Sequence, residues 1–232
     1  MFKKLLVTVV VILFAQTSAF GQGVTPDLAQ GKTAMLFSFS GLSNLGAGDF
    51  EGGLGIKYYY SQGLALRLGL QFATASEDIP ANPSPGQTSV DGEQSATRLG
   101  ISAAAEWHRG VGRANAYLGG GLGFSRTSTE SKSPALGTTS QVVVKNNDSG
   151  ENIAGAGTFF GGRAFSLFAL AGVEFFVVKE VSLAAEYRLG FSSLSRADEE
   201  RTAGNQTITA KIGGSSGVGI ANSGVLTLAF YF

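Results

Sequence analysis

The sequence predicts an all-β protein: an eight-stranded antiparallel up-and-down transmembrane β-barrel that follows an N-terminal signal peptide. Apolar and polar residues alternate over segments of about nine residues or more, the length that a tilted strand needs to cross a bilayer. Short and long connections alternate along the chain. After residue 22, no apolar stretch is long enough for a membrane-spanning helix.

Residues 1–21 are predicted to be a secretory signal peptide. The basic segment MFKK precedes the apolar run LLVTVVVILFA and the small residues of TSAFG. Loss of Lys3 and Lys4 lowers the basic count from 17 to 15, against 17 acidic residues, so the mature chain has no strong positive field for nucleic acid. The predicted organisation is a signal peptide (1–21), a short periplasmic lead (22–32) and a barrel (33–232).

Eight segments from residue 33 onward alternate with the period of two that indicates a strand between two environments. In the first, Met35, Phe37 and Phe39 share one face, whereas Ser38 and Ser40 share the other. The expected strands are 33–41, 52–60, 64–75, 97–107, 114–125, 165–177, 181–193 and a last strand that starts near 215 and runs to 232.

The connections differ in length in a regular order. The segments SQG, HRGVGR and VKE follow the second, fourth and sixth strands. Longer segments, 76–94, 126–157 and 194–213 among them, follow the odd-numbered strands and are expected to be polar loops. This order places tight turns on the periplasmic side and long loops outside, as in an outer-membrane barrel.

Aromatic residues on the apolar faces gather toward both ends of the strands. Such positions suit the two interfacial girdles of a membrane barrel. Near the short turns they are Tyr58, Tyr60, Trp107, Phe175, Phe230 and Phe232, and toward the long loops they are Phe72, Phe124, Phe165 and Phe191.

The last segment, GVLTLAFYF, alternates to its final residue. In a closed barrel this strand would pair with the first and leave no edge in lipid. Phe232, preceded by the alternating Phe230 and Leu228 with Gly224 upstream, resembles the assembly signal of bacterial outer-membrane proteins. With glycine-rich strands such as YLGGGLGF, the mature chain resembles the small OmpA/OmpX-type barrels. That resemblance implies a monomer in the bacterial outer membrane, in contact with membrane lipid and lipopolysaccharide and inserted by the barrel-assembly machinery.

The polar faces carry charges in mid-strand. An eight-stranded barrel is just wide enough for side chains to fill, and buried charges need partners. The turn SQG is expected to set Tyr60 opposite Leu64, and therefore Lys57 opposite Arg67, so that acids must reach both cations from across the lumen. The predicted lumen network is Lys57, Arg67, Arg98, Glu106, Glu174, Glu186 and Arg188. It could act as a structural plug, or alternatively as an ion path or gate.

The sequence offers little material for catalysis. It has one histidine and no cysteine, and His108 lies beside the second short turn. The lipid A deacylases of this barrel type use a histidine–serine pair at the opposite end. We therefore predict no enzyme, catalytic residue, metal site or cofactor. The predicted role is structural or surface-interactive. The alternatives are a narrow pore or transporter for small solutes, a lipid-modifying enzyme, and a soluble lipocalin-like barrel.

Overall fold

A computed structural model describes residues 29–40, 51–137, 140–153, 157–220 and 224–232. The expected signal peptide, most of the lead and the first long connection lie outside these ranges. Among the described residues, the structure contains no helix with the length and apolar character needed to cross a membrane.

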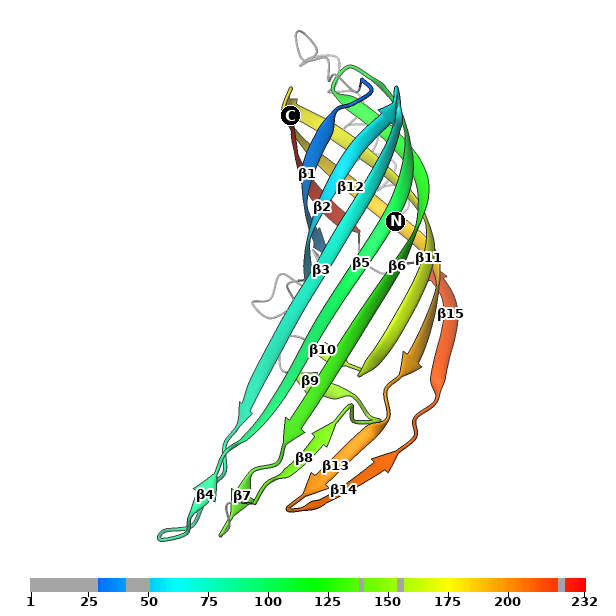
Figure 1. Ribbon diagram of the computed structural model, residues 1–232. Helices are drawn as coiled ribbons and strands as arrows, with labels where there is room; N and C mark the ends of the chain where they lie inside the picture. The colour runs from blue at the N-terminus through cyan, green and yellow to red at the C-terminus, as the bar shows by residue number, and fades with distance from the viewer. Residues whose placement is uncertain (1–28, 41–50, 138–139, 154–156, 221–223) are drawn as a thin grey trace, which may run out of the picture.

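The described strands form a closed antiparallel ring (Figure 1). Each wall strand pairs with the next along the chain, and the final strand returns to pair with the first. This confirms the predicted all-β fold of eight antiparallel wall strands. The wall consists of β1 (Thr33–Ser40), β2 (Glu51–Ser61), β3 (Leu64–Ile79), β5 (Gly92–Val111), β6 (Ala114–Lys132), β11 (Gly162–Val178), β12 (Val181–Arg196) and an eighth strand in two described pieces, β15 (Gly214–Ile220) and β16 (Val225–Tyr231).

Three turns of two residues each close one end of the barrel, which we call the short-turn end: 62–63, 112–113 and 179–180. At the first of them, Gly63 has a φ of 77°, a conformation that glycine adopts without strain. The expected pairing of Tyr60 with Leu64 is wrong, because Ser61 pairs with Leu64 and the register shifts at Tyr60. That irregularity compensates for the shorter turn, so Lys57 still lies opposite Arg67.

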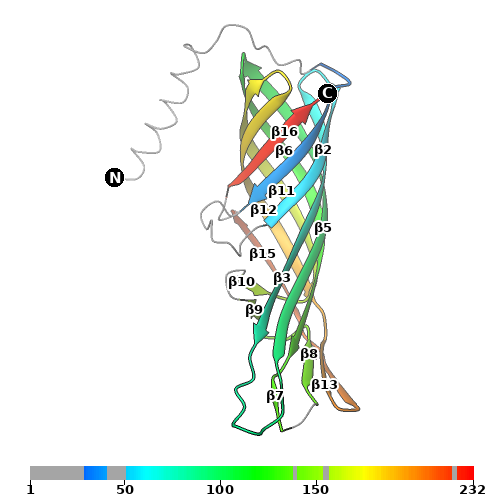
Figure 2. The same ribbon diagram turned by 90° about the vertical axis from the view of Figure 1, so that its left-hand side faces the viewer.

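The opposite, long-loop end contains far more strand than expected (Figure 2). The third strand continues to Ile79, the fourth begins at Gly92 and the fifth runs to Lys132. Polar segments rich in serine and threonine can pair as strands where both faces meet water. Polar composition alone therefore did not distinguish these strands from loops. The additional strands are β4 (Ser89–Val90), β7 (Ala135–Leu136), β8 (Val142–Lys145), β9 (Glu151–Ile153), β10 (Gly157–Phe159), β13 (Glu199–Ala203) and β14 (Gln206–Ala210).

The outward side chains form a continuous apolar belt around the barrel. On β5 the belt extends from Leu99 to Trp107, which matches the 9–11 residues of a strand that crosses a bilayer. Leu68 and Trp107 are 65% and 63% exposed, whereas the inward neighbours Ala65 and Arg67 are buried. An exposed apolar surface of this extent is expected to face lipid. A soluble lipocalin-like barrel would instead place its polar side chains outside, so that alternative is wrong.

The belt ends near the long-loop end. There the outward positions change to Thr74 on β3, Thr97 on β5, Arg126 on β6, Arg163 on β11 and Ser193 on β12. The predicted girdle aromatics, Tyr58, Tyr60, Trp107, Phe175, Phe230, Phe232, Phe72, Phe124, Phe165 and Phe191, are all exposed on the outer face.

The two faces of β16 can be compared directly by mutation. Leu228 points outward between Phe37 and Leu183, whereas the inward Thr227 is buried with its hydroxyl oxygen 3.0 Å from that of Ser38. We expect Leu228→Lys to lower the free energy of unfolding by about 2–4 kcal/mol, because the ammonium group would enter the hydrocarbon layer. Thr227→Ser keeps the hydroxyl and should cost much less. Urea unfolding in lipid vesicles measures both, and equal losses would contradict the face assignment.

Candidate functional site

Five charged side chains from five wall strands meet inside the barrel. Alternation along each strand turns them inward, and all five are at least nine-tenths buried. Two of the carboxylates are fully buried, at 0% exposure: Glu106 and Glu174. The five are Lys57 on β2, Arg67 on β3, Glu106 on β5, Glu174 on β11 and Glu186 on β12.

Positive and negative groups alternate through this cluster. The Lys57 ammonium lies 3.2 Å from carboxylate oxygens of both Glu174 and Glu106. Arg67 Nη1 is 2.8 Å from Glu106 Oε1, an ion pair whose angle does not make it a well-formed hydrogen bond. Arg67 also donates two hydrogen bonds, of 2.9 and 3.2 Å, to the two oxygens of Glu186.

Arg188 extends the series by donating from Nε to Glu186 Oε1 at 2.6 Å. The alternation thus runs from Glu174 through Lys57, Glu106, Arg67 and Glu186 to Arg188, with three acids and three bases. We call these six residues the lumen cluster. Burial of charges is costly unless each has an opposite charge and further hydrogen bonds, and this arrangement supplies both.

Neutral groups donate further hydrogen bonds to Glu174 and Glu186, whereas Glu106 Oε1 has only its ion pair with Arg67. Ser182 and Tyr231 both donate to Glu174 Oε1, the tyrosine at 2.6 Å. The Tyr117 hydroxyl donates to Glu186 at 3.2 Å. These hydrogen bonds stabilise the charged carboxylates and fix their orientation, so the cluster holds the strands in one arrangement.

His108 is a member of this site that sequence reasoning missed. Its ring is buried, with Nε2 3.0 Å from Glu106 Oε2 and Nδ1 3.4 Å from the Tyr59 hydroxyl. It also stacks on Tyr117, with ring centroids 5.0 Å apart. The available signal was its spacing of two residues from Glu106, which places both side chains on the same face of β5.

Packed aromatic and aliphatic side chains fill the lumen between the cluster and the short-turn end. Tyr59, Phe176 and Tyr231 form the largest part of this layer, with Phe176 and Tyr231 ring centroids 5.1 Å apart. On the other side of the cluster, the Arg188 guanidinium lies 4.8 Å above the Phe168 ring. The interior is therefore a packed core at this level and not an open channel.

Arg98, the seventh residue of the predicted network, lies apart from the other six. It faces the lumen nearer the long-loop end, where its Nε donates to Thr127 Oγ1 at 3.2 Å and its guanidinium lies 5.4 Å from the centre of the Phe159 ring. Arg98 and Glu106 share a face of β5 but do not meet, because Arg98 lies nearer the long-loop end of the same strand.

Phe159 belongs to a hairpin, β9–β10, that folds into the barrel mouth. Ile153 and Phe159 are buried against Ala75 of β3 and Ala96 of β5, both inward-facing. The sequence analysis expected a polar external loop over residues 126–157, and this part of that expectation is wrong. The apolar Ile153 and Phe159 bury their side chains on the exposed inner face of the wall.

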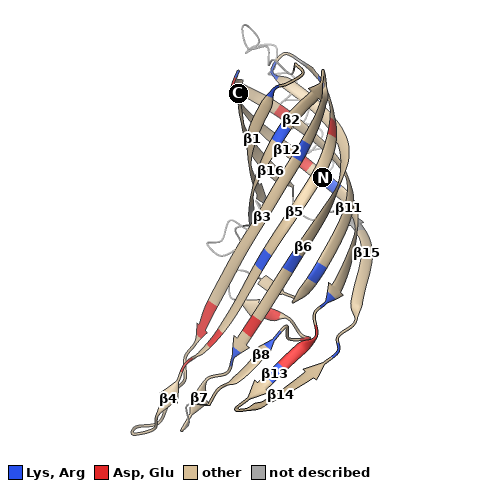
Figure 3. Ribbon diagram, viewed as in Figure 1, with Lys and Arg blue, Asp and Glu red and all other residues tan. Residues whose placement is uncertain are grey.

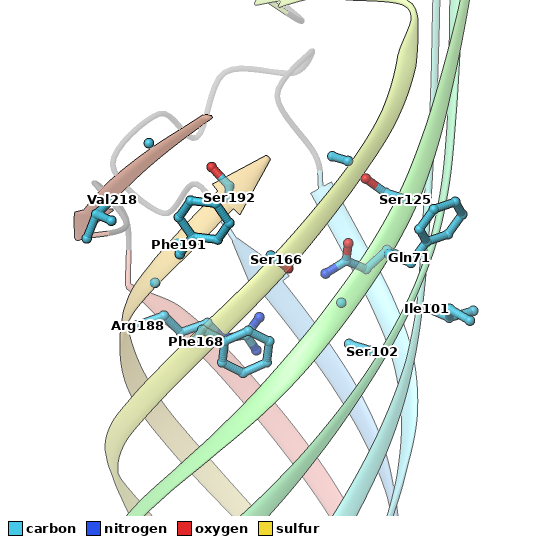
Figure 4. Close-up of a pocket in the computed structure, with 15 residues that line it drawn as sticks. Gln71, Ile101, Ser102, Ser125, Ser166, Phe168, Arg188, Phe191, Ser192 and Val218 are labelled. Atoms are coloured by element: carbon cyan, nitrogen blue, oxygen red, sulfur yellow. The ribbon is translucent and has the colours of Figure 1, made fainter. Parts of the chain in front are cut away.

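A cavity of about 550 Å³ lies in the lumen between the hairpin and the cluster (Figure 4). Its inward lining is largely polar, from Gln71, Ser102, Ser125 and Ser166, with Arg188 and Phe168 toward the cluster. In the described part of the chain, no group of three or more His, Cys, Asp or Glu side chains is arranged to hold a metal ion.

The four residues of the predicted assembly signal lie along the start and outer face of β16. Gly224 precedes the strand, and Leu228 contacts the neighbouring strands from the outer face. Phe230 packs edge-on against Phe37, with centroids 5.8 Å apart, and Phe232 is 72% exposed. The signal residues are thus presented outward and do not share the lumen cluster.

Glu151 of the β9–β10 hairpin gives a pH-dependent prediction. It lies beyond the apolar belt and is buried with Oε1 unpartnered, and this burial raises the pKa of its carboxyl, assisted by the negative charge of Glu199 and opposed by a hydrogen bond from Asn147. Because the native pKa is raised, the Glu151 carboxyl binds its proton more tightly in the docked hairpin than in the unfolded chain. Stability is therefore full below the unfolded pKa and declines as the pH rises through the native pKa.

We expect the backbone amides of Asn152 and Ile153 to exchange more slowly at about pH 4 than at neutral pH, after correction for intrinsic rates. Glu151→Gln should slow exchange at neutral pH and remove the pH dependence, whereas Glu200→Gln on the exposed β13 should do neither. Unchanged pH dependence in Glu151→Gln would contradict the assignment.

Comparisons with known proteins support the fold. No family model matches the sequence, and no curated protein sequence matches it significantly. Among solved structures, a major outer membrane protein from Thermus thermophilus is 12% identical, with a TM-score of 0.50 over 88% of this chain and all (100%) of that one. The N-terminal β-barrel domain of Pseudomonas aeruginosa OprF is 10% identical, with a TM-score of 0.35 over 88% and 98%.

Neisserial surface protein A is 15% identical, with a TM-score of 0.41 over 87% and 95% of the two chains. At such identities a likeness concerns the fold alone, and the Thermus protein is the match that carries it. Together with the apolar belt and the closed ring of strands, it identifies the fold as that of a bacterial outer-membrane β-barrel.

Proposed function

We propose that this protein is a non-conducting barrel of the bacterial outer membrane, with a structural role inside the envelope and a surface-interactive role outside it. The observation that carries the proposal is the lumen cluster, whose ion pairs run without interruption from β11 to β12 through β2, β5 and β3. An ion that crossed the barrel would have to separate buried pairs, each of which costs several kcal/mol to break.

The extended long-loop end supports the surface-interactive part. There β13 and β14 pair with each other and β13 pairs with β8, which carries the sheet well beyond the apolar belt. Every residue of β14 is exposed. A paired sheet is already ordered, so binding to it loses little conformational entropy. Such a surface suits contact with molecules outside the cell.

The site chemistry supports a role without catalysis. The protein's only histidine is held between Glu106 and Tyr59, and its nearest carboxylates are already paired with Lys57 and Arg67. A serine hydroxyl does lie beside the lumen cluster, but Ser182 donates to Glu174 and not to the histidine. In this site, the serine that could act as a nucleophile and the histidine that could act as a base are thus each held by other partners.

A narrow pore for small solutes is the second candidate. The polar cavity between the cluster and the β9–β10 hairpin favours this candidate, because a solute could enter the cavity from the long-loop end once that hairpin moved. Passage would still require the cluster to open. Conductance therefore separates the two candidates.

We expect single-channel recordings of the wild-type protein to show no large steady current. Glu174→Gln should lower the free energy of unfolding by about 3 kcal/mol, because Lys57 would lose one of its two buried counter-charges. It should also produce a leak that the wild type lacks. Glu180→Gln in the exposed turn of the same end is the control and should change neither measurement. Large steady currents through the wild type would overturn the plug and favour the pore.

We also propose that barrel-assembly machinery recognises the outward aromatic pattern of β16. Phe232→Ala keeps the backbone hydrogen bonds that join residue 232 to Thr33 and removes only the exposed ring. We expect it to lower outer-membrane levels in cells several-fold more than it lowers stability after refolding. Phe191→Ala, which removes an exposed aromatic from β12, provides the comparison. Equal cellular levels for the two variants would mean that Phe232 serves only as part of the wall.

A further inference from the structure

Two arginines lie side by side on the outer face, where the apolar belt ends. Arg126 of β6 and Arg163 of β11 are direct cross-strand partners, and both are exposed. Figure 3 shows basic segments on the neighbouring β6 and β11 toward the long-loop end. At the next outward positions toward the apolar belt, Phe124 and Phe165 are also direct cross-strand partners, and their side chains are 46% and 45% exposed. An aromatic pair is thus followed by a cationic pair on the same two strands.

The two arginines have no counter-charge in the described part of the chain. Neither forms an ion pair or hydrogen bond there, and two acids further out on β5 and β6, Glu93 and Glu130, both pair with Lys132. Like charges placed directly opposite each other across a strand pair repel. An anion between the two guanidinium groups would remove this repulsion.

The neighbours of the pair divide into an apolar and a polar side. Leu99 lies opposite Arg126 and continues the belt. The exposed Ser195 lies directly opposite Arg163, and beyond the arginines the exposed Thr97 and Ser128 provide further hydroxyl groups. The surface therefore passes from hydrocarbon-compatible rings to cations to hydroxyls, in the order of the acyl chains, phosphate and polar headgroup of a lipid.

We propose that Arg126 and Arg163 bind the headgroup phosphate of an anionic membrane lipid in the leaflet at the long-loop end. The guanidinium group matches phosphate in shape and can donate two parallel hydrogen bonds to it. Directly opposed residues have Cβ atoms roughly 5 Å apart, so both side chains can converge on one phosphate. This inference rests on the proposed outer-membrane location.

The test uses the full refolded barrel in detergent micelles, with lipid binding followed by native mass spectrometry. The probes are lipid A, dephosphorylated lipid A, phosphatidylglycerol and inorganic phosphate. We expect lipid A to bind the wild type and the dephosphorylated form to bind at least about tenfold more weakly, since charge-assisted hydrogen bonds are lost. Arg126→Gln and Arg163→Gln should each weaken lipid A binding about tenfold. Arg163→Lys, which keeps the charge without the planar fork, should fall between wild type and Arg163→Gln.

Arg109→Gln is the matched control, because Arg109 is an exposed arginine on the outer face near the short-turn end. Equal weakening in this variant would overturn the site in favour of general charge attraction. Equal binding of both lipid A forms would also overturn it. If inorganic phosphate competes with lipid A at the same concentration, the site binds free phosphate and the proposed lipid ligand is wrong. Tight binding of phosphatidylglycerol would support a phosphate site that accepts several lipids.

Failure of the two proposals is distinguishable by insertion into phosphatidylcholine vesicles. A barrel that does not insert would contradict the membrane location itself. A barrel that inserts, resists denaturation until heated and shows no preference for phosphorylated lipid would contradict only the lipid site.

Discussion

The pairing of β16 with β1 is the interaction on which the rest of this structure depends. A strand in lipid has no water to hydrogen-bond its free edge, so the sheet must close on itself. Seven residue pairs, from Ala34 and Tyr231 to Ser40 and Val225, make this closure. Closure fixes the number of strands and thus the width of the lumen, which side chains fill at the level of the lumen cluster. The charges that alternation turns inward are thereby brought within contact distance of one another.

The lumen cluster also makes the register specific. Side chains change faces at every residue, so a slip of one position on any wall strand would place its inward charges in lipid and its leucines in the lumen. The energetic penalty would include both the desolvated charge and the partners that it leaves unpaired. Hydrophobic residues in the lumen could fill the same space, but they would not distinguish one register from another so sharply. The cluster therefore contributes to the uniqueness of the fold as well as to filling the lumen.

Much of this arrangement could be predicted from the sequence because it depends on local rules. Period-two alternation assigned the faces of Lys57, Arg67, Glu106, Glu174 and Glu186, and the short turns set their approximate level. Arg98 shows the limit of this rule, because two residues that share a face of a strand can still lie far apart along the barrel axis. The β9–β10 hairpin shows a second limit. Its burial depends on a complementary surface formed by β3 and β5, and no local pattern in residues 151–159 reveals that surface.

The contrast between the two hairpins at the long-loop end has a consequence for how this surface can change over evolutionary time. The β9–β10 hairpin is held by side chains inside the mouth, so its substitutions must remain compatible with the wall. The β13–β14 hairpin projects outward, and its tip at Gly204, with a φ of 58°, has open space around the glycine. New sequence can be accommodated at that tip without disturbing the membrane-embedded wall. The exposed surface of the long-loop end can therefore diversify at this tip while the buried interior of the barrel stays unchanged.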